Sequence, residues 1–153
     1  MDWVLICRTF LDSNGWKRLF EEEGFEGDWG FVRFDKENSN KTAVILGASG
    51  LIGSYLFEDF KRNGYKVIGT YNKHRSNNLI YFDITKNSLN DLDIEKIDYL
   101  IICSAIAKID ECMANLENSR NINVNHMKRI IKEAIDKKIK LVFISGAIVF
   151  DGN

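Results

Sequence analysis

The sequence contains no proline, and its formal net charge is only -1 over 153 residues. We interpret the missing proline as a compositional bias and draw no function from it. Because the acidic and basic residues are scattered and nearly balanced, no strong field would attract nucleic acid or an anionic membrane. The longest apolar runs, at 99–103 and 141–145, are far shorter than the roughly 20 residues that a membrane-spanning helix needs. The composition therefore disfavours polyanion binding and membrane insertion.

Cysteine and histidine are also scarce. The three cysteines, Cys7, Cys103 and Cys112, form no metal-ligand spacing and leave one unpaired in any disulfide arrangement. His74 and His126 are far apart and lack acidic or cysteine companions at ligand spacing. We expect no metal site. Since the N-terminus also lacks the pattern of a secretion signal, a reducing cytoplasm is the expected location.

The length and the composition, with 45% hydrophobic and 28% charged side chains, are typical of a soluble globular protein with one core. A polar stretch at 35–41 separates an N-terminal extension, 1–40, from a larger domain, 41–153. Apolar and aromatic segments in the extension predict a strand, an amphipathic helix and a strand. One interpretation of the extension is an added unit that covers a sheet edge.

In the larger domain, apolar strands alternate with helices. Strands are expected at 43–47, 66–71, 79–82, 98–103 and 140–145. Because these strands are apolar on both faces and helices separate them, they predict an α/β fold with a doubly wound parallel sheet in the order 3-2-1-4-5.

Helical spacing of apolar residues predicts two helices in this domain. The first, at 51–63, ends at Gly64, where a left-handed cap is often needed. The second is the long segment 119–137. The apolar stripes are Leu51, Ile52, Tyr55, Leu56 and Phe60 in the first helix, and Ile122, Met127, Ile130, Ile131, Ala134 and Ile135 in the second.

The stretch GASGLIG at 47–53 joins the first strand to the first helix. Gly47 permits a tight turn, Gly50 lets backbone N–H groups approach a pyrophosphate, and Gly53 lets the helix pack closely on the strand. The helix N-terminus then faces the phosphates with its partial positive charge. The alternative is a glycine turn that binds no ligand. Because the triplet follows a strand and opens a helix, we favour a dinucleotide site.

The end of the second strand indicates which dinucleotide would bind. An Asp or Glu there would bind the ribose 2′-hydroxyl of NAD, but the sequence reads VIGTYNKHR, with Lys73, His74 and Arg75 just beyond. These side chains match the 2′-phosphate of NADP better, while NAD stays open. The alternative is a solvated basic loop.

Several stretches in matching order resemble the extended short-chain dehydrogenase/reductases, and most closely their dTDP-4-dehydrorhamnose reductase-like, sugar-nucleotide branch. GASGLIG is similar to the glycine motif of the family, VIGTYN to its second strand, and YFDIT to the segment whose Asp lies beside the adenine. ICSAIAKIDECMANLENSRNINV looks like its fourth strand and following helix, and FISGAIVFDGN like its STDYVFDG stretch. The resemblance covers about 42–152.

This resemblance implies a Rossmann-like sheet, truncated after the fifth strand, that binds a dinucleotide and, in the full-length family, a nucleotide sugar. It is compatible with an oligomer. The residues that the motifs and the resemblance together assign to cofactor binding are Gly47, Ser49, Gly50, Leu51, Ile52, Gly53, Tyr71, Lys73, Arg75, Asp83, Ile84, Cys103, Ser104, Ala105, Asn123 and Ser145.

The catalytic groups of the family are missing from the sequence. The family uses a Ser or Thr, a Tyr and a Lys four residues after that Tyr for hydride transfer. Its Thr position falls on Gly146, and the neighbouring Ser145 would point to the opposite face of the strand. No Tyr-x-x-x-Lys occurs, and the resemblance implies that the Tyr and Lys of the family would come after residue 153. Asp110 and Glu111 could be an acid/base pair, but we interpret them as a solvated helix start, and Cys103 as a small apolar residue. We therefore assign no catalytic residue.

Three functions remain open. The favoured one is the cofactor-binding part of a short-chain-type sugar-nucleotide reductase or epimerase. A second is a nucleotide-binding or regulatory module without turnover, which a resemblance to the regulatory β subunit of methionine adenosyltransferase permits. In a third, residues 15–34, which resemble the closing helix and strand of class I methyltransferases, make the chain a fusion of two enzyme fragments.

Overall fold

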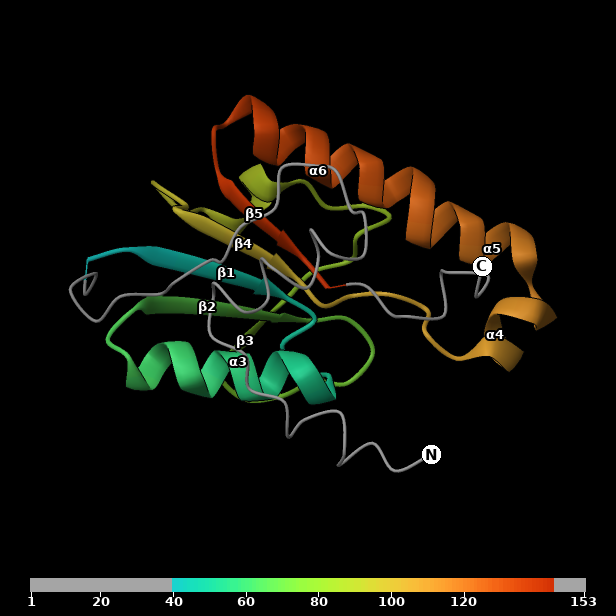
Figure 1. Ribbon diagram of the computed structural model, residues 1–153, viewed down its shortest axis with the longest axis horizontal. Helices are drawn as coiled ribbons and strands as arrows, with labels where there is room; N and C mark the ends of the chain where they lie inside the picture. The colour runs from blue at the N-terminus through green and yellow to red at the C-terminus, as the bar shows by residue number, and fades with distance from the viewer. Residues whose placement is uncertain (1–39, 145–153) are drawn as a thin grey trace, which may run out of the picture. The chain divides into compact units, whose positions relative to one another are not determined.

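The computed structural model describes residues 40–144 of the chain (Figure 1). The chain divides into two units, residues 1–35 and 36–153, and every described residue belongs to the second. The elements predicted within the N-terminal extension lie outside the described residues, as do Ser145 and Gly146. The predictions for those positions therefore remain predictions.

A parallel sheet forms the centre of the second unit. Its strands are β1 (Thr42–Leu46), β2 (Lys66–Tyr71), β3 (Leu79–Tyr81), β4 (Tyr99–Ile102) and β5 (Lys140–Phe143). They lie in the order β3-β2-β1-β4-β5, and each neighbouring pair is parallel. The structure confirms the predicted fold class and strand order. The order reverses between β1 and β4, which is the switch point where ligands bind to such sheets.

The central strands are apolar because both of their faces are covered. All residues of β1 and β4 are buried, whereas the edge strands β3 and β5 are partly exposed. Side chains alternate along a strand, so Val44 and Leu46 of β1 pack with Leu100 and Ile102 of β4 on one side of the sheet.

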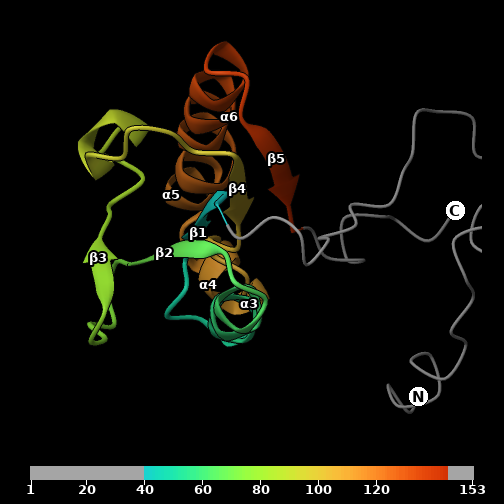
Figure 2. The same ribbon diagram turned by 90° about the vertical axis from the view of Figure 1, so that its left-hand side faces the viewer.

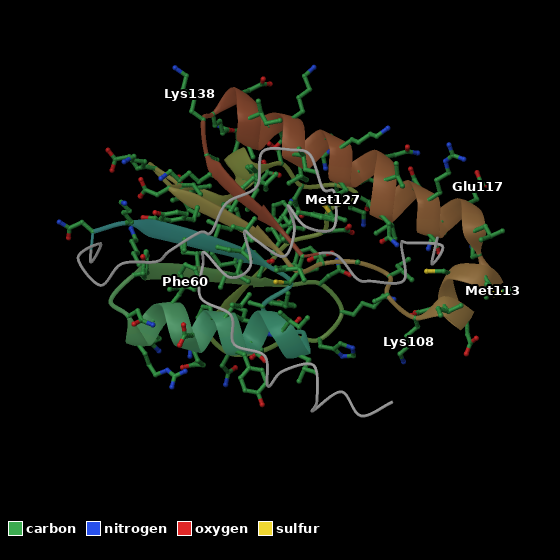
Figure 3. The ribbon with its side chains drawn as sticks, in the orientation of Figure 1. Phe60, Lys108, Met113, Glu117, Met127 and Lys138 are labelled. Carbon is green, nitrogen blue, oxygen red and sulfur yellow. The ribbon has the colours of Figure 1, made fainter. Side chains whose placement is uncertain are left out.

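Helices cover both faces of the sheet (Figures 1 and 2). Phe60 of α3 (Leu51–Arg62) and Met127 of α6 (Met127–Asp136) point toward the sheet from opposite sides, and both are buried (Figure 3). The remaining helical segments are the 3-10 turn η1 (Leu89–Leu92), α4 (Ile109–Ala114), α5 (Leu116–Arg120) and the π-helical segment η2 (Asn121–His126). The predicted second helix thus corresponds to α5, η2 and α6 in succession, and it begins at Leu116, earlier than expected.

The end of α3 confirms the prediction for Gly64, which follows the helix with a φ of 82°. Its backbone N–H donates to the carbonyl oxygen of Lys61 at 3.1 Å. A left-handed conformation at this position is typical of a helix C-terminus and favours glycine.

The predicted apolar stripes are only partly correct. In α3, Leu51, Ile52 and Tyr55 are 77%, 53% and 71% exposed. Each residue advances about 100° around a helix, so Leu51 and Tyr55 lie opposite the side on which Gly53 and Phe60 face the sheet.

A similar correction applies to the second stripe. Met127, Ile130 and Ala134 are buried, and Ile131 packs against the core. Ile135 is 64% exposed, because it points about 100° around the helix from the buried Ala134.

Candidate functional site

Most of the residues predicted to bind the cofactor lie at or just after the ends of four neighbouring strands, and Asn123 lies in η2. Because those strands are parallel, the turns after β1, β2, β3 and β4 all leave from the carboxyl edge of the sheet. The structure brings the glycine turn, the loop after β2, the turn after β3 and the loop after β4 to this edge. It describes all of the predicted cofactor residues except Ser145.

The glycine turn between β1 and α3 has no room for side chains at two of its three glycines. Gly47 has a φ of 84°, and a Cβ atom there would lie 2.6 Å from the Ser104 hydroxyl oxygen. At Gly53, a Cβ atom would collide with the carbonyl oxygen of Gly47. These contacts give Gly47 and Gly53 the roles that the sequence predicts, in the tight turn and in the close packing of helix on strand.

Gly50 differs from the other two because it is exposed. Its backbone N–H donates to the carbonyl oxygen of Gly47 at 3.0 Å. A Cβ atom at Gly50 would approach only that oxygen, at 3.3 Å, and open space lies beyond. The turn therefore leaves a clear approach to the first turn of α3.

The N-terminus of α3 can attract an anion. No side chain caps this helix end, and its first turn contains no acidic residue. The exposed Leu51 and Ile52 carry backbone N–H groups in that first turn. Uncapped N–H groups together with the helix dipole favour negative charge, and phosphate is the usual ligand of such an arrangement.

Thr70, near the end of β2, holds the glycine turn in place, and the sequence analysis missed it. The buried Thr70 hydroxyl accepts a hydrogen bond from the Gly47 N–H at 3.1 Å and donates to the Ile45 carbonyl oxygen at 3.5 Å. A hydroxyl at the end of an apolar strand was the available signal. The adjacent Gly69 leaves room for Ala48, whose side chain a Cβ atom at Gly69 would approach to 2.7 Å.

We expect Thr70→Val to lower the free energy of unfolding by about 1–3 kcal/mol, because the half-buried Gly47 N–H would lose its acceptor. Urea denaturation of the full chain measures this. Thr70→Ser keeps the hydroxyl and should lose less stability. Equal losses in the two variants would show that the hydrogen bond is unimportant.

The loop after β2 carries the predicted basic residues into solvent. Tyr71 packs edge-on against Tyr81 of β3, with ring centroids 5.7 Å apart. Lys73 Nζ lies 4.0 Å from Glu111 Oε1, so the loop after β2 approaches the first turn of α4, while Arg75 is exposed. Asp110, the other carboxylate of that turn, is also exposed, in line with its interpretation as a solvated helix start.

Asp83 follows β3 as an ionised carboxylate. Its Oδ1 atom accepts hydrogen bonds from the Thr85 N–H at 2.9 Å and from the Thr85 hydroxyl at 2.7 Å. Partial burial raises the pKa of Asp83, but these hydrogen bonds and the nearby charge of Lys86 outweigh burial and hold the pKa below its usual range. The half-buried Ile84 packs against the core.

The loop after β4 meets the glycine turn. Cys103 N–H donates to the Leu46 carbonyl oxygen at 2.9 Å, and burial raises the pKa of the Cys103 thiol, which favours the uncharged form. Asn123 of η2 fixes the far end of this loop, because its amide oxygen accepts from Ile106 N–H and its amide nitrogen donates to Ile106 O, both at 2.9 Å. Ala105 is exposed between these two anchors.

A cavity of about 810 Å³ lies at the opposite edge of the sheet, among residues that precede β1, β4 and β5. Its lining includes Lys41, Asp98, Tyr99 and Lys140, and none of the predicted cofactor residues. Parallel sheets of this kind bind ligands at the carboxyl edge, so the glycine turn remains the candidate site. Within residues 40–144, no helix is long and apolar enough to cross a membrane, and no cluster of His, Cys, Asp and Glu is arranged to hold a metal ion.

A parallel α/β sheet with a glycine turn at its switch point is the Rossmann-like class of fold. The sequence model of the NAD dependent epimerase/dehydratase family matches residues 43–152, and the chain belongs to this family. The resemblance to short-chain dehydrogenase/reductases is thus confirmed at the level of the family. The match does not include residues 15–34, and it lends no support to their resemblance to methyltransferases.

Three proteins show how the chain relates to others. It is 29% identical over 119 residues to the probable low-salt glycan biosynthesis reductase Agl14 of Haloferax volcanii, covering 72% of this chain and 38% of the relative. It is 29% identical over 126 residues to methionine adenosyltransferase 2 subunit beta of Xenopus tropicalis, covering 79% and 37%. The structure of a hypothetical dTDP-4-dehydrorhamnose reductase from Sulfolobus tokodaii aligns with a TM-score of 0.66 at 29% identity, covering 73% and 41%. The chain therefore spans about two fifths of each of these proteins.

Proposed function

We propose that this chain binds NAD(P) at the glycine turn, as the cofactor-binding part of a sugar-nucleotide reductase or epimerase. The observation that carries the proposal is the shape of the turn. Gly47 and Gly53 have no room for a side chain, whereas the space beyond Gly50 is open toward the uncapped first turn of α3. These features fit a pyrophosphate, which needs backbone N–H donors and close approach of the main chain.

The other residues at this edge would hold the two halves of the dinucleotide. Asp83 and Ile84, which follow β3, are proposed to face the adenosine half, and Cys103, Ser104 and Ala105, which follow β4, the nicotinamide half. Asn123 supports this second group, since its amide anchors Ile106 at the end of the loop. The bound cofactor would supply or accept a hydride in such an enzyme.

A nucleotide sugar is the second proposed partner. The supporting observation is the alignment with a hypothetical dTDP-4-dehydrorhamnose reductase at 29% identity. A binding module without turnover is the second candidate. Two observations favour it: Gly146 stands at the Thr position of the family, and a methionine adenosyltransferase beta subunit is as similar to the chain as a probable reductase is.

We expect NADPH to bind more tightly than NADH, because the loop after β2 offers Lys73 and Arg75 and contains no carboxylate. Arg75→Ala should weaken NADPH binding about tenfold and leave NADH binding unchanged, since a charge-assisted hydrogen bond contributes roughly 1.5–3 kcal/mol. Isothermal titration calorimetry with both cofactors measures the effect.

Lys66→Ala is the matched control, because Lys66 is an exposed cation at the other end of β2. Equal affinity for the two cofactors in the unmodified chain would contradict the preference for NADP. Failure of both cofactors to bind would contradict the proposed function itself.

A further inference from the structure

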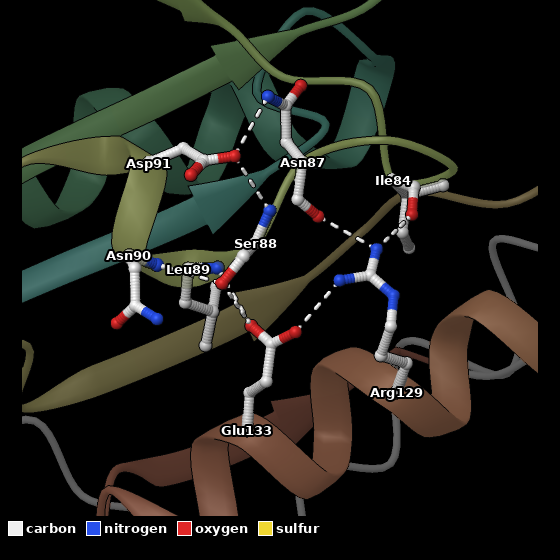
Figure 4. Close-up of polar contacts among 8 residues, drawn as sticks. All are labelled: Ile84, Asn87, Ser88, Leu89, Asn90, Asp91, Arg129 and Glu133. Atoms are coloured by element: carbon white, nitrogen blue, oxygen red, sulfur yellow. Dashed lines mark hydrogen bonds and ion pairs between the residues drawn. The ribbon is translucent and has the colours of Figure 1, made fainter.

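Two side chains of α6, Arg129 and Glu133, bind the segment that connects β3 to η1 (Figure 4). They form an ion pair with 2.8 Å between Arg129 Nη1 and Glu133 Oε1. Arg129 Nη2 also donates to the carbonyl oxygens of Ile84 and Asn87, both at 2.7 Å. The two side chains are 37% and 22% exposed, so water screens this ion pair less than it screens a fully exposed one.

Glu133 binds the same segment farther along. Its Oε2 atom accepts hydrogen bonds from the Ser88 hydroxyl at 3.0 Å and from the Leu89 N–H at 2.8 Å. Ser88 is the N-terminal cap of η1. Arg129 and Glu133 together therefore hold the segment from Ile84 to Leu89 at both ends.

Asp83 is connected to Arg129 through Asn87. The Asp83 carbonyl oxygen accepts from the N–H groups of Lys86 and Asn87, at 2.9 and 2.7 Å. The Asp83 N–H donates to the side-chain oxygen of Asn87 at 2.8 Å. These bonds close a compact turn, which we call the Asp83 turn (residues 83–87). Arg129 binds two carbonyl oxygens of this turn, those of Ile84 and Asn87.

Arg129 of α6 hydrogen-bonds directly to the backbone of the Asp83 turn. The strand before the turn, β3, has three residues, and among the described residues it pairs with β2 alone. A planar guanidinium with several N–H donors can bind two carbonyl oxygens and a carboxylate at once, whereas an ammonium is a compact point charge. Arginine at position 129 is therefore suited to fix the orientation of the turn.

We propose that Arg129 and Glu133 are positioning residues that orient the Asp83 turn and thereby set the affinity for the adenosine half of the dinucleotide. This inference rests on the proposed function, in which Asp83 and Ile84 face the adenosine. Neither side chain needs to touch the cofactor. Their effect passes through the backbone of Ile84 and Asn87.

The test compares Arg129→Met, Arg129→Lys and Glu133→Gln with the unmodified chain. Calorimetry with ADP-ribose, which contains the adenosine half without nicotinamide, measures the affinity at a temperature where circular dichroism shows every variant folded. Arg129→Met should weaken ADP-ribose binding about tenfold. Arg129→Lys should weaken it less, because lysine keeps the charge and part of the hydrogen bonding. Glu133→Gln should also weaken it less than Arg129→Met does, because glutamine keeps an acceptor for Ser88 and Leu89 but loses the charge that pairs with Arg129.

Ile130→Val is the matched control, because it removes a buried methyl group from the same helix without touching the polar contacts. A second readout is amide hydrogen exchange of Lys86 and Asn87, whose N–H groups bind the Asp83 carbonyl oxygen. Exchange at these two amides should rise in Arg129→Met and stay unchanged in Ile130→Val.

Unchanged ADP-ribose affinity in Arg129→Met would overturn the proposal, as would an equal loss of affinity in Ile130→Val. If Arg129→Met does not fold, Arg129→Lys and Glu133→Gln decide by the same criteria. If the unmodified chain binds neither a dinucleotide nor ADP-ribose, the proposed function fails, and the adenosine-binding role fails with it. The exchange measurement then still decides whether Arg129 orients the turn.

Discussion

Gly50→Trp is expected to lower dinucleotide affinity at least a hundredfold while lowering the stability of the fold by only about 1 kcal/mol, because a Cβ atom there would lie 3.3 Å from the carbonyl oxygen of Gly47. Gly50 is exposed, and its φ of -83° is accessible to every residue type. A side chain there would project into the open space beyond the turn and block the approach to the N-terminus of α3. Loss of two charge-assisted hydrogen bonds, at roughly 1.5–3 kcal/mol each, accounts for the size of the effect.

Calorimetry with NADPH and thermal denaturation of the same samples would separate the two effects. Tyr55→Trp is the control, since Tyr55 is an exposed aromatic residue one turn farther along α3. It should change neither affinity nor melting temperature. Unchanged NADPH affinity in Gly50→Trp would show that the glycine turn is not the binding site.

Gly53→Ala, in contrast, should destabilise the whole domain, by about 1–2 kcal/mol net. Alanine favours a helix over glycine by roughly 1 kcal/mol. At this position, however, the added methyl group would collide with the carbonyl oxygen of Gly47 and lie 2.9 Å from the Cα atom of Ala48. Both contacts are with backbone that cannot move without shifting β1 or α3, and overpacking of this kind typically costs 1–3 kcal/mol or more.

Urea denaturation measures the loss, and Ser54→Ala is the control on the next residue. Ser54 is exposed, so its replacement should change stability by less than about 0.5 kcal/mol. If Gly53→Ala is as stable as the unmodified chain, helix and strand do not pack as closely as the structure indicates.

The topology could be predicted from the sequence because its signals are local. Continuous apolar runs at β1 and β4 indicate strands that are buried on both faces, and helices between the strands require parallel pairing. The glycine turn was also predictable, because three glycines at fixed spacing report conformations of the turn itself. The left-handed Gly47 and the closely packed Gly53 are such cases.

Contacts between distant segments could not be predicted in this way. Thr70 and Gly47 are 23 positions apart, and Arg129 and Ile84 are 45 apart. Nothing in either short stretch indicates its partner. The buried face of α3 was missed for a related reason, since Gly53 contributes to the contact with the sheet but adds nothing to an apolar stripe, whereas the exposed Leu51 and Tyr55 do.

The pairing of β1 has a consequence for how the chain folds. Ala43 of β1 pairs with Val67 of β2 on one side and with Tyr99 of β4 on the other. The ribosome must therefore add 56 residues after Ala43 before β4 can begin to pair with β1. At synthesis rates of about 5–20 residues per second, that interval lasts roughly 3–11 seconds. During this time the edge of β1 that pairs with β4 is without its native neighbour, although β1 is apolar on both faces. Since the chain has no proline, slow prolyl isomerisation adds nothing to the delay, and closure of β4 onto β1 is the step that ends it.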